Sequence, residues 1–206
     1  MAGGRRQGFT LIELLIVIGI IGLLTALALP AISAIRRRSQ VKAVEATLNH
    51  IRLQIETYAN DFGDYPPSSF RRLGVRRNNG QNEGVECLLL CLTTSSKSGP
   101  YLQPKDEDLG NSDGDSLSGS ANPTQSVYSS SELFELRDYW RNPLVYIHNA
   151  EYDRPATVTL AAGVDEIRAT QSQKTGQYHG LTSFQLWSSG PDGLANTEDD
   201  IRMWGE

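Results

Sequence analysis

One uncharged apolar segment near the start of the chain constrains its fold more than any other feature. No charged residue occurs from Leu14 to Ile35, and this stretch matches the roughly 20 apolar residues that cross a bilayer as a helix. A single carboxylate, Glu13, stands at its head. An ionised side chain inside such a segment costs about 2.5–3.5 kcal/mol on insertion scales, so it normally has a partner. The segment therefore predicts a membrane-spanning helix with one functional charge.

A chain end freed just before this segment would supply that partner. Cleavage after Gly8 would leave a positive α-amino group on Phe9, a few residues from Glu13. The amine of one subunit would then pair with the glutamate of its neighbour inside the membrane. Such a pair predicts a protein that polymerises through its helices.

The residues from Gly8 to Glu13, in the order Gly-Phe-Thr-Leu-Ile-Glu, resemble the processing site of type IV pilins and of the pseudopilins of type II secretion. In that family a membrane-bound prepilin peptidase cuts after the glycine and methylates the new amino terminus. The resemblance implies processing at Gly8 and Phe9, with Glu13 as the assembly glutamate. It also implies a helical filament of identical subunits, together with minor pseudopilins and an assembly platform in the inner membrane.

An ordinary secretory signal is the competing interpretation of the same residues. The arginines at 5–6 would form its basic start, and Ala26-Leu27-Ala28 its cleavage site; the paired arginines also suit a twin-arginine address. The apolar run, however, exceeds the roughly 7–15 residues of a signal core, and such a core gives no role to Glu13. The amino terminus of the mature protein separates the two interpretations: Phe9 for a processed subunit, Leu29 for a secreted one.

Charge is unevenly distributed along the chain. The total is −5, and residues 1–38 carry +4 from five arginines and Glu13, which leaves −9 for the remainder. An acidic outer domain argues against a nucleic-acid partner, which would need basic patches. Counting Lys and Arg on each side of the apolar segment would place the outer domain in the cytoplasm. The processing motif requires the leader there instead, and the motif decides the predicted orientation.

The apolar segment continues into an amphipathic one. Pro30 removes a backbone donor and predicts a kink. Beyond it, apolar residues recur at steps of three and four, which places them on one face of a helix: Val41, Val44, Leu48, Ile51, Ile55, Tyr58 and Phe62. Gly63 and the prolines at 66–67 predict the end of this helix. The predicted layout is a leader at 1–8, a transmembrane half-helix at 9–35, an amphipathic half-helix at 36–62 and a globular head at 63–206.

The head is expected to be α+β, with a small antiparallel sheet packed on the long kinked helix. Residues 83–92 predict a second helix, and strands are expected at 144–148, 156–160 and 183–188. Residues 105–131 are expected to form a long loop or a partly ordered insertion, and residues 161–180 a second polar insertion. The stretches Asp61–Pro67 and Asp138–Tyr146 resemble turns of major pseudopilins that close the long helix and precede the sheet.

Cysteine and histidine usage indicates no catalytic centre. Cys87 and Cys91 share one face of the second predicted helix, where a disulfide would be strained, so small buried side chains are expected. No nucleophile motif, triad signature or phosphate-binding glycine loop is visible. We therefore expect a non-enzymatic protein.

The carboxyl end contains the clearest candidate for a ligand site. Four carboxylates fall between residues 192 and 200, and crowded like charges favour a neutralising cation such as calcium, which takes six to eight oxygen ligands. The segment resembles the calcium loop of type II secretion major pseudopilins. The resemblance implies side-chain ligands from Asp192, Asp199 and Asp200 and a backbone carbonyl from Ser189, while Glu198 is expected to face solvent. An exposed acidic turn without an ion is the alternative.

A second acidic stretch contains Asp106, Asp108, Asp113 and Asp115. Its spacing does not match an EF-hand loop, and a solvated loop is expected.

Together these features predict a subunit of a periplasmic pseudopilus that drives type II protein secretion. The chain would be a single-pass protein of the inner membrane with its carboxyl-terminal head in the periplasm. One alternative is a type IV pilin for adhesion, motility or DNA uptake. Another is a secreted calcium-binding domain that does not polymerise.

Overall fold

The computed structural model describes residues 10–74, 79–116 and 131–204, which form an α+β protein as expected. The chain divides between Gln40 and Val41 into two compact units. The first helix, α1 (Leu11–Phe62), contributes to both units. Its helical assignment continues through position 30, and the predicted kink there stays a prediction.

The amino-terminal part of α1 exposes apolar side chains. Leu11 is 82% exposed, and Ile12 and Ile35 are each 66% exposed. Among the helices of the described residues, none meets the combined length and apolarity expected of a membrane span. The span predicted for residues 9–35 is therefore not confirmed.

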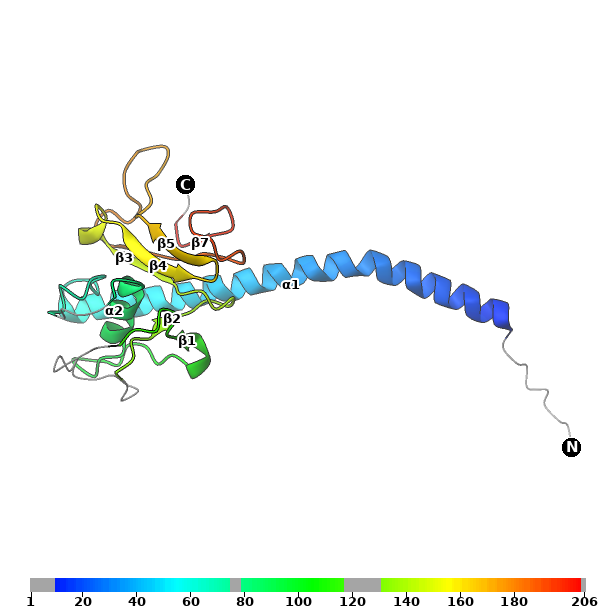
Figure 1. Cartoon of the computed structure of the whole chain (residues 1–206), viewed down its shortest axis with the longest axis horizontal. Coiled ribbons are helices and arrows are strands. Elements are labelled where there is room, and N and C mark those ends of the chain that lie inside the picture. The colour runs from blue at the N-terminus through cyan, green and yellow to red at the C-terminus, as the bar shows by residue number, and fades with distance from the viewer. Residues whose placement is uncertain (1–9, 75–78, 117–130, 205–206) are drawn as a thin grey trace, which may run out of the picture. The chain divides into compact units, whose positions relative to one another are not determined.

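The carboxyl-terminal part of α1 forms the centre of the head's core. The predicted apolar stripe is confirmed from Val44 to Tyr58, whose members are buried, whereas Phe62 at its end is 39% exposed. Gly63 ends the helix as predicted: its φ is +82°, and its N–H donates to the carbonyl of Ala59 at 2.8 Å. A left-handed residue at this position suits glycine, because it has no Cβ to clash. Figure 1 shows the strands of the head gathered around this part of α1.

The second helix, α2 (Glu83–Leu92), has the predicted bounds. Cys87 and Cys91 are buried and free, as expected. Gly84 lies against β3 (Val145–His148) so closely that a Cβ there would come within 2.1 Å of the carbonyl oxygen of Tyr146. This contact fixes how deeply α2 enters the head, since backbone atoms yield little.

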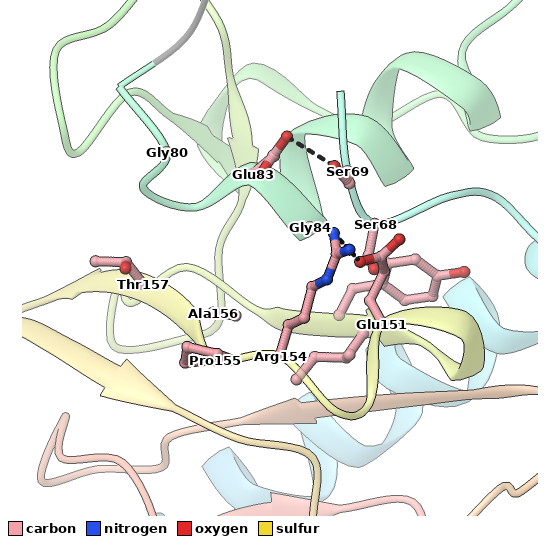
Figure 2. A pocket seen from close by; sticks show the side chains of 12 residues that line it. Ser68, Ser69, Gly80, Glu83, Gly84, Glu151, Arg154, Pro155, Ala156 and Thr157 are labelled. Carbon is pink, nitrogen blue, oxygen red and sulfur yellow. Dashed lines mark hydrogen bonds and ion pairs between the residues drawn. The ribbon is translucent and has the colours of Figure 1, made fainter. Parts of the chain in front are cut away.

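A cleft of about 140 Å³ opens beside Gly84. Figure 2 shows Glu83 bonded to Ser69 on one side and Arg154 paired with Glu151 on the other. Glu83 also accepts from the backbone N–H of Phe70 at 2.5 Å. The charged groups of the cleft are thus already paired with protein atoms.

The strands form three small antiparallel sheets. In the first, β3 pairs with β6 (Phe184–Ser188), which pairs in turn with β7 (Ile201–Arg202). The second is a hairpin of β4 (Ala156–Leu160) and β5 (Gly163–Ile167). The third joins β1 (Leu109–Gly110) to β2 (Glu135–Leu136). Single-turn 3₁₀ helices lie at Asp106–Asp108 and Asn149–Glu151.

The three predicted strands are confirmed. Those expected at 144–148, 156–160 and 183–188 are present as β3, β4 and β6. The short strands β2 and β7 were not predicted, and neither was β5, which lies in the insertion at 161–180 and pairs along the full length of β4. Residues 105–131 contain β1, and a bridge joins Ser116 to Glu132; residues 117–130 of this insertion lie outside the described part.

Candidate functional site

The amino-terminal candidate site is described from residue 10 onward. Thr10 and Glu13 form a reciprocal pair at the start of α1: Glu13 accepts from the backbone N–H and the hydroxyl of Thr10, both at 2.8 Å, and donates its own N–H to the Thr10 hydroxyl at 3.3 Å. This is a capping box, which satisfies backbone donors that a helix start leaves free. Glu13 therefore has a local role in addition to its predicted assembly role. The processing residues Gly8 and Phe9 lie outside the described residues.

The carboxyl-terminal candidate site is a loop between β6 and β7. Pairing of Trp187 with Arg202 and of Ser188 with Ile201 closes the base of this loop. Gly190 adopts a φ of +68°, and a Cβ there would lie 2.2 Å from the carbonyl oxygen of Asp199. Only glycine fits at this close approach. The two ends of the acidic loop thus come together.

Two buried residues of an earlier turn form hydrogen bonds to the start of the loop. Asp138 accepts from the Ser188 hydroxyl at 2.6 Å, and the amide of Asn142 donates to the carbonyl of Gly190 at 3.4 Å. Burial raises the pKa of Asp138, although hydrogen bonds from Ser188 and the turn backbone oppose that shift. The sequence marked this stretch as a turn, but it did not indicate that Asp138 and Asn142 hold the acidic loop.

Protein groups already balance much of the negative charge of the loop carboxylates. Asp199 accepts from the Thr197 hydroxyl at 2.6 Å and from the backbone N–H of Asp192 at 3.1 Å. Burial raises the pKa of Asp199, but these hydrogen bonds outweigh it and the net shift is downward. Asp200, whose side chain is fully buried, pairs with Arg202 at 2.7 Å. Burial raises the pKa of Asp200 against the opposing effect of Arg202.

Some oxygen atoms of the loop retain capacity for a cation. The second carboxylate oxygen of Asp200 and the hydroxyl of Ser189 are buried without a hydrogen-bond partner. Glu198 is exposed, which agrees with its predicted orientation toward solvent. The donor set is entirely oxygen, which suits calcium. Asp192, Asp199 and Asp200 are not among the residues that the described structure clusters within metal-ligand distance.

A different carboxylate group does meet that distance. One oxygen each from Glu86, Asp113 and Glu135 lie within 4.8 Å of one another. The solvated loop expected around Asp113 and Asp115 is therefore wrong for these two residues, since both are partly buried. One signal could have found this group: Glu86 is the single charge in the apolar run from Val85 to Leu92, a pattern like that of Glu13.

Comparison with known proteins agrees with the amino-terminal pattern. Residues 3–29 match the prokaryotic N-terminal methylation motif. Over 99% of its length the chain is 24% identical to the type II secretion system core protein G of Escherichia coli, covering 94% of that protein. The chain carries the amino-terminal motif of prepilin-type proteins. The resemblance to pseudopilins of type II secretion is supported by both matches, whereas no solved structure matches significantly.

Pilus proteins match the chain over its amino-terminal region. The type IV major fimbrial protein FimA of Dichelobacter nodosus is 46% identical over 27% of the chain and 36% of its own length. The type IV wide pilus major component PilA4 of Thermus thermophilus is 46% identical over 30% of the chain and 47% of its own length. The chain thus aligns with about a third of the length of the fimbrial relatives from Dichelobacter.

These relatives also bear on catalysis. Their names describe fimbrial, pilus and secretion-system core proteins. The prediction that the chain is not an enzyme is confirmed by these matches.

Proposed function

We propose that this pilin-like chain is a structural subunit of a periplasmic pseudopilus that drives type II protein secretion. The chain would be cut after Gly8, methylated on Phe9 and held in the inner membrane by residues 9–35, with its head in the periplasm. Assembly would then pack the helices of neighbouring subunits, together with minor pseudopilins, on an inner-membrane platform. Support for secretion over adhesion comes from the similarity to core protein G, which extends through the head.

The observation behind filament assembly is the exposed apolar surface that follows a single carboxylate. Large apolar side chains from Leu11 to Ile35 are between 43% and 82% exposed where they are described. A surface this extensive marks contact with lipid or with other proteins. Glu13 at its head would pair with the freed amine of Phe9 on the adjacent subunit, which would set the register between helices.

The capping box allows the charge of Glu13 to be tested apart from its local role. Glutamine also forms capping boxes, so Glu13→Gln should keep the helix start while removing the charge. We expect Glu13→Gln to abolish filaments, as seen by electron microscopy and cross-linking of membranes, while the protein accumulates normally. Thr10→Ala removes the capping hydroxyl, keeps the carboxylate and should retain filaments. Filaments of normal abundance from Glu13→Gln would contradict the proposed pairing.

We also propose that the loop from Ser189 to Asp200 binds calcium. Asp192, Asp199 and Asp200 would provide side-chain oxygens and Ser189 a backbone carbonyl. The unpartnered carboxylate oxygen of Asp200 and the close approach of Gly190 to Asp199 support this assignment. With full-length protein in detergent micelles, Asp199→Asn should remove one bound calcium ion per chain. The exposed neighbour provides the matched control, because Glu198→Gln should bind calcium as the unaltered chain does.

A type IV pilus is the second candidate, favoured by the fimbrial matches over the amino-terminal region. Deleting the gene separates the two systems. Loss of protein export with surface fibres intact supports the pseudopilus, and loss of fibres with export intact supports the pilus. A calcium-binding domain that does not polymerise would give no filaments even from the unaltered chain.

A further inference from the structure

Four carboxylates from three separate segments meet inside the head, apart from the carboxyl-terminal loop. Glu86 comes from α2, Glu135 from β2, and Asp113 and Asp115 from the segment that follows β1. Glu86 and Glu135 are fully buried. We refer to Glu86, Asp113, Asp115 and Glu135 as the inner carboxylate cluster.

Glu135 is fixed within the cluster by three donor groups. Its carboxylate accepts from the Asn82 amide at 2.8 Å, from the backbone N–H of Ser112 at 3.0 Å and from the Ser112 hydroxyl at 3.1 Å. Asn82 is itself buried and donates to the same hydroxyl at 3.0 Å. These contacts orient one carboxylate toward the others, as the supporting residues of a metal site do.

The other three residues present oxygens without donors. Five carboxylate oxygens are buried without a hydrogen-bond partner: both of Glu86, one of Asp113 and both of Asp115. Within the described ranges, no member of the cluster takes part in a salt bridge. A buried acceptor without a partner costs about 1–3 kcal/mol, and more when it is charged. The cluster therefore calls for a positive species that the described side chains do not supply.

The electrostatics of Glu86 agree with this view. Burial, followed by the negative charges of Asp115, Asp113, Glu135 and Glu83, raises the pKa of Glu86 to about 10. Burial and the charge of Asp113 raise the pKa of Asp115 to about 6. Hydrogen bonds from the Asn79 backbone and the Glu86 side chain oppose the shift at Asp115 without cancelling it. A cation would compensate the charged forms of both groups, and a bound proton is the competing occupant.

We propose that the inner carboxylate cluster binds a hard divalent cation, with calcium as the ion of best fit. All of the donors are carboxylate oxygens, which exclude the sulfur and nitrogen ligands that zinc prefers. One oxygen each from Glu86, Asp113 and Glu135 lie within 4.8 Å of one another, which oxygens at 2.3–2.6 Å from one calcium ion can do. Magnesium, at 2.0–2.1 Å, requires a tighter octahedral shell.

Such an ion would connect three elements that are distant in the sequence. It would join α2 to β2 and to residues 113–115, next to the base of the insertion where β1 pairs with β2. Leu109 pairs with Leu136, and Gly110 with Glu135, the residue that also belongs to the cluster. Calcium would therefore hold the insertion against α2, a role different from that proposed for the carboxyl-terminal loop.

Counting bound ions tests the proposal. Full-length protein in detergent micelles is treated with chelator, dialysed and then titrated with calcium, with bound ions measured by equilibrium dialysis. We expect two ions per chain for the unaltered protein, one for Glu86→Gln and one for Asp199→Asn, and none for the double variant. Glu166→Gln makes the same change at an exposed carboxylate and should still bind two.

The outcomes distinguish this site from the carboxyl-terminal one. If Glu86→Gln binds as many ions as the unaltered chain, the inner site is refuted whatever Asp199→Asn does. If only Glu86→Gln loses an ion, the inner site stands and the loop proposal fails. A second variant covers the case in which Glu86→Gln misfolds. Asp115 is only partly buried, and Asp115→Asn should weaken the calcium affinity of the inner site about tenfold. Unchanged affinity in a folded Asp115→Asn protein would remove that residue from the site and contradict the proposed cluster.

Discussion

The head contains two groups of acidic side chains that differ in how their charge is balanced. In the carboxyl-terminal loop, Asp200 pairs with Arg202 and Asp199 accepts hydrogen bonds from Thr197 and Asp192. In the inner carboxylate cluster, Glu86 has neither a donor nor a cation within the described residues. The loop looks more acidic in the printed sequence, yet the inner cluster has more unpartnered oxygens. Crowding along the chain is therefore a weaker guide to a cation than convergence in space.

The largest expected effect comes from removing the internal counterion of the loop. Arg202→Met leaves the fully buried Asp200 carboxylate without its partner, and breaking a buried pair costs about 3 kcal/mol of unfolding free energy. Chemical denaturation of the chelator-treated protein measures this loss. Arg168→Met is the matched control, since its pair with Glu166 is exposed and worth less than about 1 kcal/mol. Equal losses of unfolding free energy in the two variants would mean that Arg202 does not balance the charge of Asp200.

Loss of calcium from one site should have the next largest effect. A ligand at 100 times its dissociation constant stabilises the folded state by about 2.7 kcal/mol per site. We expect chelation to lower the melting temperature of the full-length protein, with a smaller decrease in Glu86→Gln. A decrease in Glu86→Gln as large as in the unaltered chain would place the whole calcium effect outside the inner cluster.

Neutralising one carboxylate in each group should change stability in opposite directions when calcium is absent. Without calcium, Glu86 must take up a proton to be buried beside other carboxylates, and Glu86→Gln removes that requirement, so it should stabilise the chelated protein by about 1 kcal/mol. Asp200→Asn removes the partner of Arg202 and should destabilise the protein by about 1–2 kcal/mol. Denaturant midpoints under chelator measure both. A change in stability of the same sign in both variants would contradict the proposed difference in charge balance between the loop and the inner carboxylate cluster.

The smallest expected effect is a pH dependence of stability caused by His148, which belongs to neither acidic group. Burial lowers the pKa of His148 below its usual 6.5, although Asp64 opposes the shift. The unfolded chain then binds more protons than the folded one just below pH 6.5, so stability falls as the pH falls through that window. The slope is at most about 1.4 kcal/mol per pH unit for one group.

Melting at saturating calcium between pH 7.5 and 5.5 should show this loss in the unaltered chain. His148→Gln should reduce it, and His50→Gln, at an exposed position of α1, should not. A full pH dependence in His148→Gln would assign the acid sensitivity to the carboxylates instead.

Local sequence patterns predicted the elements that depend on local physics. The bounds of α2 and β4, the buried stripe of α1 and the glycine cap at Gly63 follow from apolar periodicity and backbone preference. The strand β5 was missed because its residues from Gly163 to Glu166 are exposed and three of the four are glycine or acidic, which are rare in strands. Only their pairing with β4 makes them a strand. Such pairing depends on partners that no local window contains.

The candidate sites also divide into features set by neighbouring residues and features set by contacts between distant segments. The capping pair of Thr10 and Glu13 lies within one helical turn and can be recognised from the motif alone. Asp138 and Asn142 support a loop that begins about 50 positions later, and their role depends on the path of the chain between them. Glu86 and Glu135 likewise meet only after α2 packs against β2, although the isolated charge of Glu86 in an apolar helix was a usable signal.

The tight contact at Gly84 has a consequence for the inner carboxylate cluster. Two positions along a helix is slightly more than half a turn, so Gly84 and Glu86 point from nearly opposite sides of α2. A methyl group added at Gly84 would press the helix away from the Tyr146 carbonyl and toward the carboxylates. The spacing between acidic groups, and with it the choice among ions of different radius, is thereby governed by a residue that has no side chain and no charge.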